Sequence, residues 1–342
     1  MLIILAILVV AAWLGGETWL ARQIARGVED DPSVAAAEVT PLREPSRFGV
    51  RVEKPLIEGQ GGELTLGSID LWAAPWRPQK IWARPSTEAE ITLPERVVEV
   101  ELPDAKGYVH YAPLSGFALH DASISLTSLS LDGQPALGPA SIRAELSSRG
   151  AGAPRGAMAA YDITMEIANA QPAALTMLGL AVPPILTQAV SAEGKARLYL
   201  TDAPARGFWL GDEATRQPVA PVAVQSQGLT LRFGELQAIL RGDLRSGPTG
   251  LTDGTLLIDT SDAEGFLGTA ADAGLIPPMA VGLAGGVLNG LASAAEADEG
   301  DPPVPDGAIR LRIDFADGET RLAGQVLGPA PAFPGAVAVL PR

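Results

Sequence analysis

Apolar and polar residues alternate along much of this chain, and this pattern limits the fold more than any other feature. The clearest example runs from Ile309 to Phe315, where every second residue is apolar. Successive side chains of a strand point to opposite faces, so this segment is typical of a strand with one buried face. The Asp317-Gly318 step that follows predicts a two-residue type I′ hairpin.

That turn also predicts how the two strands of the hairpin pair. The expected pairs on the apolar face are Ile313 with Leu322, Leu311 with Gly324 and Ile309 with Val326. On the opposite face Asp314 pairs with Arg321. The turn and the apolar pattern therefore select the same register.

Other alternating segments predict further strands. They are Glu63–Leu66, Val98–Leu102, Ser123–Leu126, Leu129–Leu131, Leu229–Phe233 and Leu236–Leu240. Between Leu126 and Leu129 the alternation slips by one residue, which predicts a β-bulge. Asp132-Gly133 then has the composition of a tight turn.

Helical patterns occur in two places, Pro172–Val190 and Asp262–Ala295. Each is interrupted by a Pro-Pro step, at Pro183-Pro184 and at Pro277-Pro278, and each is flanked by predicted strands. We interpret the two places as a degenerate repeat of strand, helix, Gly-Leu…Pro-Pro, helix and strand. The acidic, proline-rich segment from Glu296 to Gly307 is interpreted as an exposed linker.

The first sixteen residues contain no charged side chain and predict a membrane anchor. Nine Leu, Ile and Val residues there favour insertion by roughly −4 kcal/mol. The run is shorter than the ~20 residues of a span, so we expect residues 17–19 at headgroup depth and Leu20 to complete it. A cleaved signal peptide is the alternative, although an A-x-A-like site is hard to find. A buried N-terminal helix is the third interpretation.

Composition excludes several classes of function. The chain has 25 basic and 40 acidic residues, a net charge of −15, and such a surface repels nucleic acid. Cysteine is absent, which excludes thiol nucleophiles and cysteine metal sites. Nucleophile, metalloprotease and phosphate-loop motifs are also absent from the sequence. We therefore predict no catalytic residue and no cofactor, and a carboxylate-dependent hydrolase is a distant alternative.

Two histidines, His110 and His120, flank a short segment that favours a hairpin. A zinc site would need a third ligand, for which Asp104 and Asp121 are candidates. The simpler interpretation is two polar positions on neighbouring strands. We therefore predict no metal site from the sequence.

The segment from Trp72 to Arg84 has the most unusual composition in the chain. It holds three of the six tryptophans and three of the 25 basic residues. One interpretation is a membrane-surface contact, with indoles at headgroup depth and cations on phosphates. The candidate residues are Trp72, Trp76, Arg77, Lys80, Trp82 and Arg84. The interpretation that we favour is a strand, a turn and a strand whose indoles pack in the core.

Several segments together resemble a known family. They are the N-terminal apolar run, Ala74–Pro78, Asp253–Leu256, Gly274–Pro278 and Phe315–Gly318. The chain resembles the family catalogued as domain of unknown function 2125, which implies an inner-membrane anchor and a periplasmic domain. Members usually carry basic residues ahead of the anchor. Here Arg22 and Arg26 follow it and none precedes it, so the orientation rests on the resemblance. More distantly, the chain is similar to AsmA-like envelope proteins, which implies phospholipid transport.

The expected fold is mainly β with a few helices: a curved antiparallel sheet of strand-helix-helix-strand repeats behind one transmembrane helix. The expected divisions are an anchor over residues 1–21, a first β-rich part over 22–225 and a second over 226–342. We expect a single-pass protein of the inner membrane with its bulk in the periplasm. Its expected function is non-catalytic, with phospholipid acyl chains bound in an apolar groove. A structural or protein-interaction module without lipid is the alternative.

Overall fold

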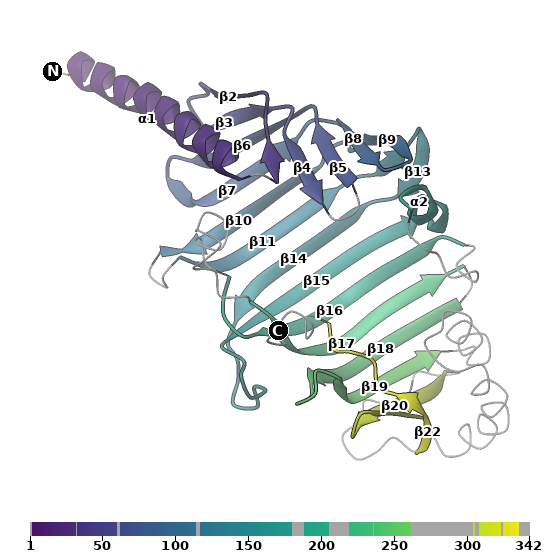
Figure 1. Ribbon diagram of the computed structural model, residues 1–342. Coiled ribbons are helices and arrows are strands. Elements are labelled where there is room, and N and C mark those ends of the chain that lie inside the picture. Colours follow the sequence, from purple (N-terminus) through teal and green to yellow (C-terminus); the bar gives the residue numbers. More distant parts are fainter. Residues whose placement is uncertain are drawn as a thin grey trace. The chain divides into compact units, whose positions relative to one another are not determined.

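The protein is mainly antiparallel β. The computed structural model describes residues 2–31, 33–59, 62–113, 117–179, 188–204, 219–234, 236–260, 304, 308–322 and 324–334. Two helices lie in this part, α1 (Leu2–Asp30) and α2 (Pro172–Met177), and the sheets are not closed (Figure 1).

The chain forms two compact units. Unit 1 comprises Met1–Arg143, Ala174–Leu180 and Ala205–Thr215, and unit 2 comprises Ala144–Ala173, Ala181–Pro204 and Arg216–Arg342. The predicted division between residues 225 and 226 falls within strand β17 (Pro221–Phe233), which pairs with both of its neighbours there.

Unit 1 contains strands of two sheets. The first has the order β1 (Val34–Ala35), β4 (Leu56–Gly59), β5 (Gly62–Leu66), β8 (Glu88–Leu93), β9 (Arg96–Glu101), β12 (Leu129–Leu131) and β13 (Gln134–Leu137). The part of the second sheet that lies in unit 1 has the order β2 (Glu38–Pro41), β3 (Phe48–Glu53), β6 (Ser68–Ala74), β7 (Arg77–Pro85), β10 (Lys106–Ala112) and β11 (Ala118–Leu126). Strand β14 (Ala140–Ser147) carries the chain into unit 2.

The chain crosses repeatedly between these two sheets through short corners. Lys54 and Asp104 lie at two of them with positive φ, and Gly67 lies at a third. Main-chain hydrogen bonds continue through the corners, from Lys54 N to Gly67 O and from Gly67 N to Glu88 O. The alternation slips after Leu126 because the chain passes there through such a corner, from one sheet to the other. The predicted bulge there is wrong, because β11 and β12 belong to different sheets.

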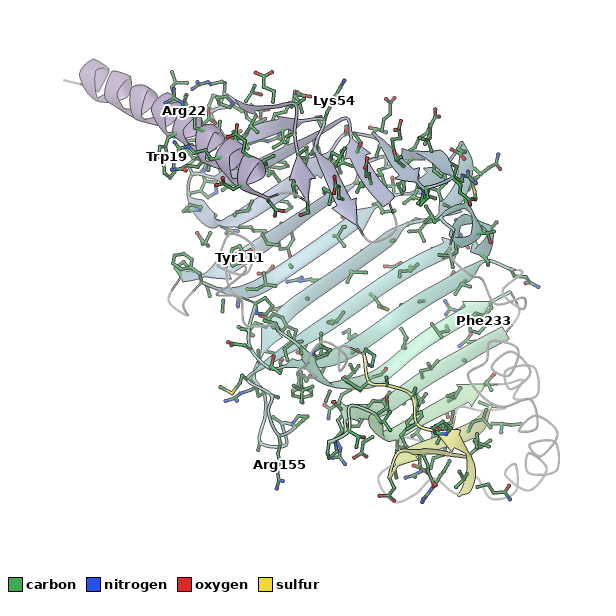
Figure 2. The ribbon with its side chains drawn as sticks, in the orientation of Figure 1. Trp19, Arg22, Lys54, Tyr111, Arg155 and Phe233 are labelled. Atoms are coloured by element: carbon green, nitrogen blue, oxygen red, sulfur yellow. The ribbon has the colours of Figure 1, made fainter. Side chains whose placement is uncertain are left out.

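Helix α1 packs along one face of β2 and β3. Ala21 is buried against Val50 and Val52, with Leu20 and Ile24 beside them. The helix continues to Asp30, past the predicted end of the anchor at residue 21, and exposes Trp19 on its outer side (Figure 2).

Glu17 is the buried polar residue of this contact. Its carboxylate is fully buried and accepts hydrogen bonds from the backbone N–H groups of Arg43 and Gly49, each at 3.2 Å. The prediction that Glu17 lies at headgroup depth is therefore wrong, because the β-sheet covers this side chain. Within the described residues, no helix combines the length and the apolar character needed to cross a membrane.

Unit 2 contains a run of antiparallel strands that pair in chain order. They are β15 (Ala159–Ala170), β16 (Val190–Leu200), β17, β18 (Leu236–Ser246), β19 (Thr252–Thr260), β20 (Ile309–Ala316), β21 (Glu319–Leu322) and β22 (Gln325–Pro329). The strands that flank the two predicted repeats, β15 with β16 and β19 with β20, are confirmed and pair with each other. Of the segments between them, α2 is described, whereas residues 180–187 and 261–303 lie outside the described residues.

The C-terminal hairpin is confirmed at its turn. Asp317 and Gly318 both have positive φ, and Ile313 pairs with Leu322 as predicted. The predicted pairing of Ile309 with Val326 is wrong. The chain reverses again at Gly324, where φ is 79°, so β22 returns along β21 and Val326 lies opposite Arg321.

One row of polar side chains crosses seven strands of unit 2 on a single face. The row consists of Asp162, Arg197, Gln225, Asp243, Thr255, Asp314 and Arg321. Neighbouring side chains of the row form hydrogen bonds: Arg197 Nε donates to the Asp162 carboxylate at 2.7 Å, and the Thr255 hydroxyl donates to the Asp314 carboxylate at 2.8 Å. The hydrogen bond from Arg197 holds the pKa of Asp162 below its ordinary value. Alternation therefore leaves the opposite face of these strands to apolar residues.

Candidate functional site

A row of three aromatic side chains lies on the face of the second sheet that α1 does not cover. Trp72, Trp82 and Tyr108 are direct partners across β6, β7 and β10. The Trp72 and Trp82 rings are stacked at 6.4 Å with 12° between their planes, and Trp82 and Tyr108 are tilted at 4.9 Å. Cross-strand partners on one face are close neighbours, so register alone brings these rings together.

Two cations lie on these rings. The Arg47 guanidinium is 4.9 Å from the centre of Trp72. The Lys80 ammonium is 3.3 Å from the centre of Tyr108 and 4.7 Å from that of Trp82. Burial lowers the pKa of Lys80. The attraction of a cation to a ring face is about 0.5–1 kcal/mol at exposed sites and greater where water is excluded. We call Arg47, Trp72, Lys80, Trp82 and Tyr108 the aromatic platform.

A row of charges continues beside the platform. Arg51 lies opposite Asp70, and Asp70 lies opposite Arg84. Arg51 binds the Asp70 carboxylate through Nε at 2.6 Å and Nη2 at 3.0 Å, and this contact raises the pKa of Arg51. Arg84, the cross-strand partner of Asp70 on β7, adds a second cation to this row. The face therefore presents flat rings together with positive charge.

The structure divides the six candidate membrane-contact residues into two groups. Trp72, Lys80, Trp82 and Arg84 lie on this face, whereas Trp76 and Arg77 lie at the β6–β7 turn. Trp76 is 71% exposed, and none of the three indoles belongs to the buried core. The favoured prediction of a strand, a turn and a strand is therefore confirmed, but its placement of the indoles in the core is wrong. Sequence reasoning also missed Arg47 and Tyr108, although Tyr108 alternates in phase with His110 on β10.

Gly49 makes room for the platform, because it lies opposite Trp72 on the same face. A Cβ atom at residue 49 would lie 2.1 Å from the Leu71 carbonyl oxygen and 2.7 Å from the Trp72 Cα.

Gly49→Ala is expected to lower the free energy of unfolding by about 1–3 kcal/mol, since the backbones of β3 and β6 must move apart. Urea denaturation followed by tryptophan fluorescence measures this loss. Gly27→Ala is the control, because residue 27 lies in α1 with open space around it and alanine favours helix. If Gly49→Ala lost no more free energy of unfolding than Gly27→Ala, the close approach of the backbones at residue 49 would be contradicted.

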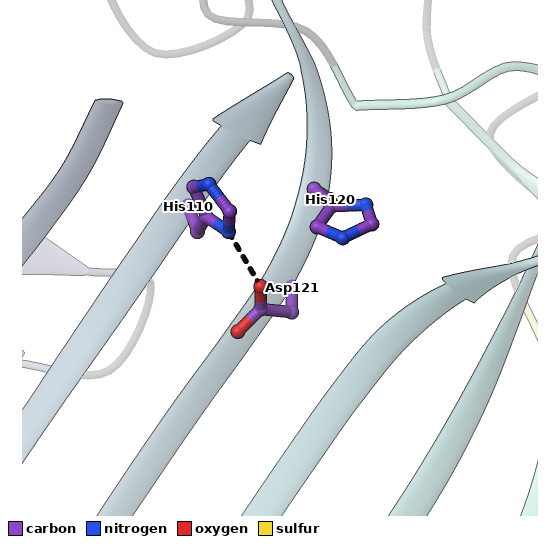
Figure 3. A group of neighbouring side chains, drawn as sticks. All are labelled: His110, His120 and Asp121. Carbon is purple, nitrogen blue, oxygen red and sulfur yellow. Dashed lines mark hydrogen bonds and ion pairs between the residues drawn. The ribbon is translucent and has the colours of Figure 1, made fainter. Parts of the chain in front are cut away.

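A histidine and carboxylate cluster lies on β10 and β11 (Figure 3). His110 pairs with Asp121, and the next pair is Tyr111 with Leu119, so His120 is the extra residue of a β-bulge. The bulge sets two residues against one and re-aims the side chains. The rings of His110 and His120 are 5.2 Å apart and nearly perpendicular.

Asp121 is the centre of this cluster. His110 Nδ1 lies 2.7 Å from its carboxylate. Burial of Asp121 acts against ionisation, but hydrogen bonds from His110 and Tyr108 outweigh it and lower the pKa of Asp121. Of the two third ligands considered in the sequence, the structure gathers Asp121 with both histidines; the group does not include Asp104.

Unit 2 offers a second surface, the apolar face opposite its polar row. One line of cross-strand partners runs through Met165, Gly194, Leu229, Leu240, Ile258 and Leu311. A parallel line runs through Tyr161, Leu198, Val224, Leu244, Gly254 and Phe315. Ile258 and Leu311 are buried, whereas Met165, Leu229 and Leu240 are only half-buried. We call these two lines the apolar face.

These features define an antiparallel β protein with an aromatic, cationic surface in one unit and an apolar sheet face in the other. Residues 16–331 match the profile of a family described as "Uncharacterized protein conserved in bacteria (DUF2125)", and the chain belongs to this family. No curated protein and no solved structure matches the chain. These comparisons show no link to AsmA-like envelope proteins.

Proposed function

We propose that this protein is a membrane-anchored, non-catalytic lipid-binding protein of the cell envelope that shelters phospholipid acyl chains on the apolar face. One observation carries the proposal: the apolar lines cross six strands without a charged residue, and their members on β15 to β18 include half-buried side chains. Each Å² of apolar surface removed from water contributes about 25 cal/mol, so an acyl chain on this face is favoured.

The N-terminal apolar run supports the location. Its insertion energy of roughly −4 kcal/mol favours a single membrane anchor. Such an anchor would hold the protein at a source of phospholipid. In this proposal the bulk of the chain lies in the periplasm, as the family resemblance implies.

The aromatic platform supports a second contact with lipid. Indoles prefer the headgroup region of a bilayer, and cations near a surface are attracted to its phosphates by about 1 kcal/mol each. Arg47 and Lys80 supply such charges beside Trp72 and Trp82. In this proposal the platform, with the exposed Trp76 at its turn, contacts headgroups.

Lipid mass spectrometry tests the proposed function. The full chain is extracted from membranes in mild detergent, purified, and its bound lipid is quantified. We expect at least stoichiometric phospholipid in the natural chain and a several-fold loss in the double variant Leu229→Gln, Leu240→Gln, because both changes put amides on the apolar face.

The matched control is the double variant Thr230→Gln, Arg232→Gln, which changes the opposite face of β17, the strand that carries Leu229. It is expected to retain its lipid. Circular dichroism confirms that both variants are folded. If the natural chain carries no phospholipid, lipid binding is excluded and the alternative of a structural module of the envelope is favoured.

A further inference from the structure

Both histidines of the chain lie in one cluster. The sequence contains two histidines in 342 residues, and the bulge between β10 and β11 brings them together beside Asp121. One ligand atom from each of His110, His120 and Asp121 lies within 4.8 Å of the other two. We propose that these three side chains bind one zinc ion, with water as the fourth ligand.

The donor atoms suit zinc. Two imidazole nitrogens and one carboxylate oxygen are common zinc ligands, with bonds of about 2.0–2.2 Å and tetrahedral geometry, which separates the donors by about 3.3 Å. The distance of 2.7 Å between His110 Nδ1 and Asp121 Oδ2 is shorter than this donor spacing, and all three donor atoms lie within 4.8 Å of one another. Small side-chain rotations can therefore bring the three donors to the spacing of a tetrahedral zinc site. The ion takes the place of the proton on Nδ1, and the neutral His110 ring then carries its proton on Nε2 instead.

The β-bulge is what makes the three donors converge. In a regular strand His120 and Asp121 would point to opposite faces. Because both residues oppose His110, the bulge re-aims them toward the same partner. Figure 3 shows the three side chains gathered beside these two strands.

The surroundings hold the carboxylate and leave the site open to solvent. Tyr108 also hydrogen-bonds the Asp121 carboxylate, as outer partners of metal ligands do. The Asp121 side chain is 12% exposed and that of His110 is 27% exposed. Lys80 is the nearby cation, and its ammonium lies on the Tyr108 ring. A site of three protein ligands on a partly exposed face keeps a position for water.

Zinc titration of the full chain tests this site. The protein is purified in detergent with a tag that contains no histidine, stripped with a chelator, and titrated with zinc chloride by calorimetry. We expect one zinc per chain. His120→Ala removes one ligand and leaves the His110–Asp121 hydrogen bond in place, so it is expected to weaken zinc binding more than about tenfold. Asp104→Asn is the matched control, because Asp104 is an acid at the corner before β10 and lies outside the cluster. This variant is expected to bind zinc as the natural chain does.

Cobalt substitution supplies a reading that does not depend on stability. Cobalt in the site is expected to give the visible absorption of a four-coordinate complex in the natural chain and in Asp104→Asn. His120→Ala is expected to lose this absorption while its circular dichroism stays native. The proposal is overturned if the natural chain takes up no zinc, or if His120→Ala binds zinc as tightly as the natural chain.

Discussion

Replacing Asp259 by alanine is expected to lower the free energy of unfolding by about 3–5 kcal/mol, the largest effect of any single change considered for this protein. The Asp259 side chain is fully buried on β19. Arg310 binds both of its oxygens, at 2.7 Å through Nε and 2.9 Å through Nη2, and Arg241 binds it from β18. Without the carboxylate, the buried Arg310 guanidinium loses its bidentate anionic partner.

Chemical denaturation of the natural and variant chains measures this loss. The matched control is Asp162→Ala, which removes an aspartate from an Arg-Asp pair of the same unit, in which the Asp162 side chain is 50% exposed. Exposed pairs contribute about 0–1 kcal/mol, so the control is expected to remain near the natural stability. Equal effects of the two changes would show that the Asp259 carboxylate is solvated in solution.

Replacing Glu17 by alanine is expected to loosen helix α1 from the sheet and to lower the free energy of unfolding by about 1–3 kcal/mol. The carboxylate satisfies the backbone N–H groups of Arg43 and Gly49 inside the contact. Arg43 in turn binds the helix, donating to the Leu14 carbonyl at 2.8 Å and to the Thr18 hydroxyl at 2.9 Å. The variant leaves the Gly49 N–H buried without its acceptor.

Hydrogen exchange of the α1 amides measures this loosening, and the edge-on contact between Trp13 and Phe48 supplies a fluorescence signal. Glu29→Ala, an exposed position of the same helix, is the control and is expected to exchange as the natural chain does. Equal protection of α1 in Glu17→Ala and in the natural chain would contradict a docking role for the carboxylate. In the proposed function this contact matters because it fixes how the domain is held relative to the anchor.

Local patterns predicted the elements of the fold well. Alternation identified strands such as β9 and β20, and the two Asp-Gly turns have the positive φ values that a type I′ turn requires. Turn chemistry and strand periodicity depend on a few adjacent residues, so both can be predicted from the chain alone. The same information failed after Leu126 and after Leu322. There the chain passes to another sheet or reverses, and no local pattern distinguishes these events from a bulge or a longer strand.

The candidate sites show the same division. The sequence singled out Trp72, Lys80 and Trp82 by composition, but their stacking depends on the register of β6 against β7 and β10. Arg47 and Tyr108 joined the platform only through that register. Asp121 and Asp104 were equal candidates as a partner of the histidines, and a single bulge selected Asp121.

The alternation of apolar and polar residues by itself determined that this chain forms antiparallel strands with one apolar face, because side-chain direction in a strand repeats every two residues. Tertiary structure alone decided which strands became neighbours, which face received helix α1, and which polar residues met across the sheet. Those choices depend on pairing between segments far apart in the chain. The buried carboxylates of Glu17 and Asp259 show why these choices cannot be read from local sequence. Each carboxylate is stable in the interior only with hydrogen-bond partners that lie far away in the chain.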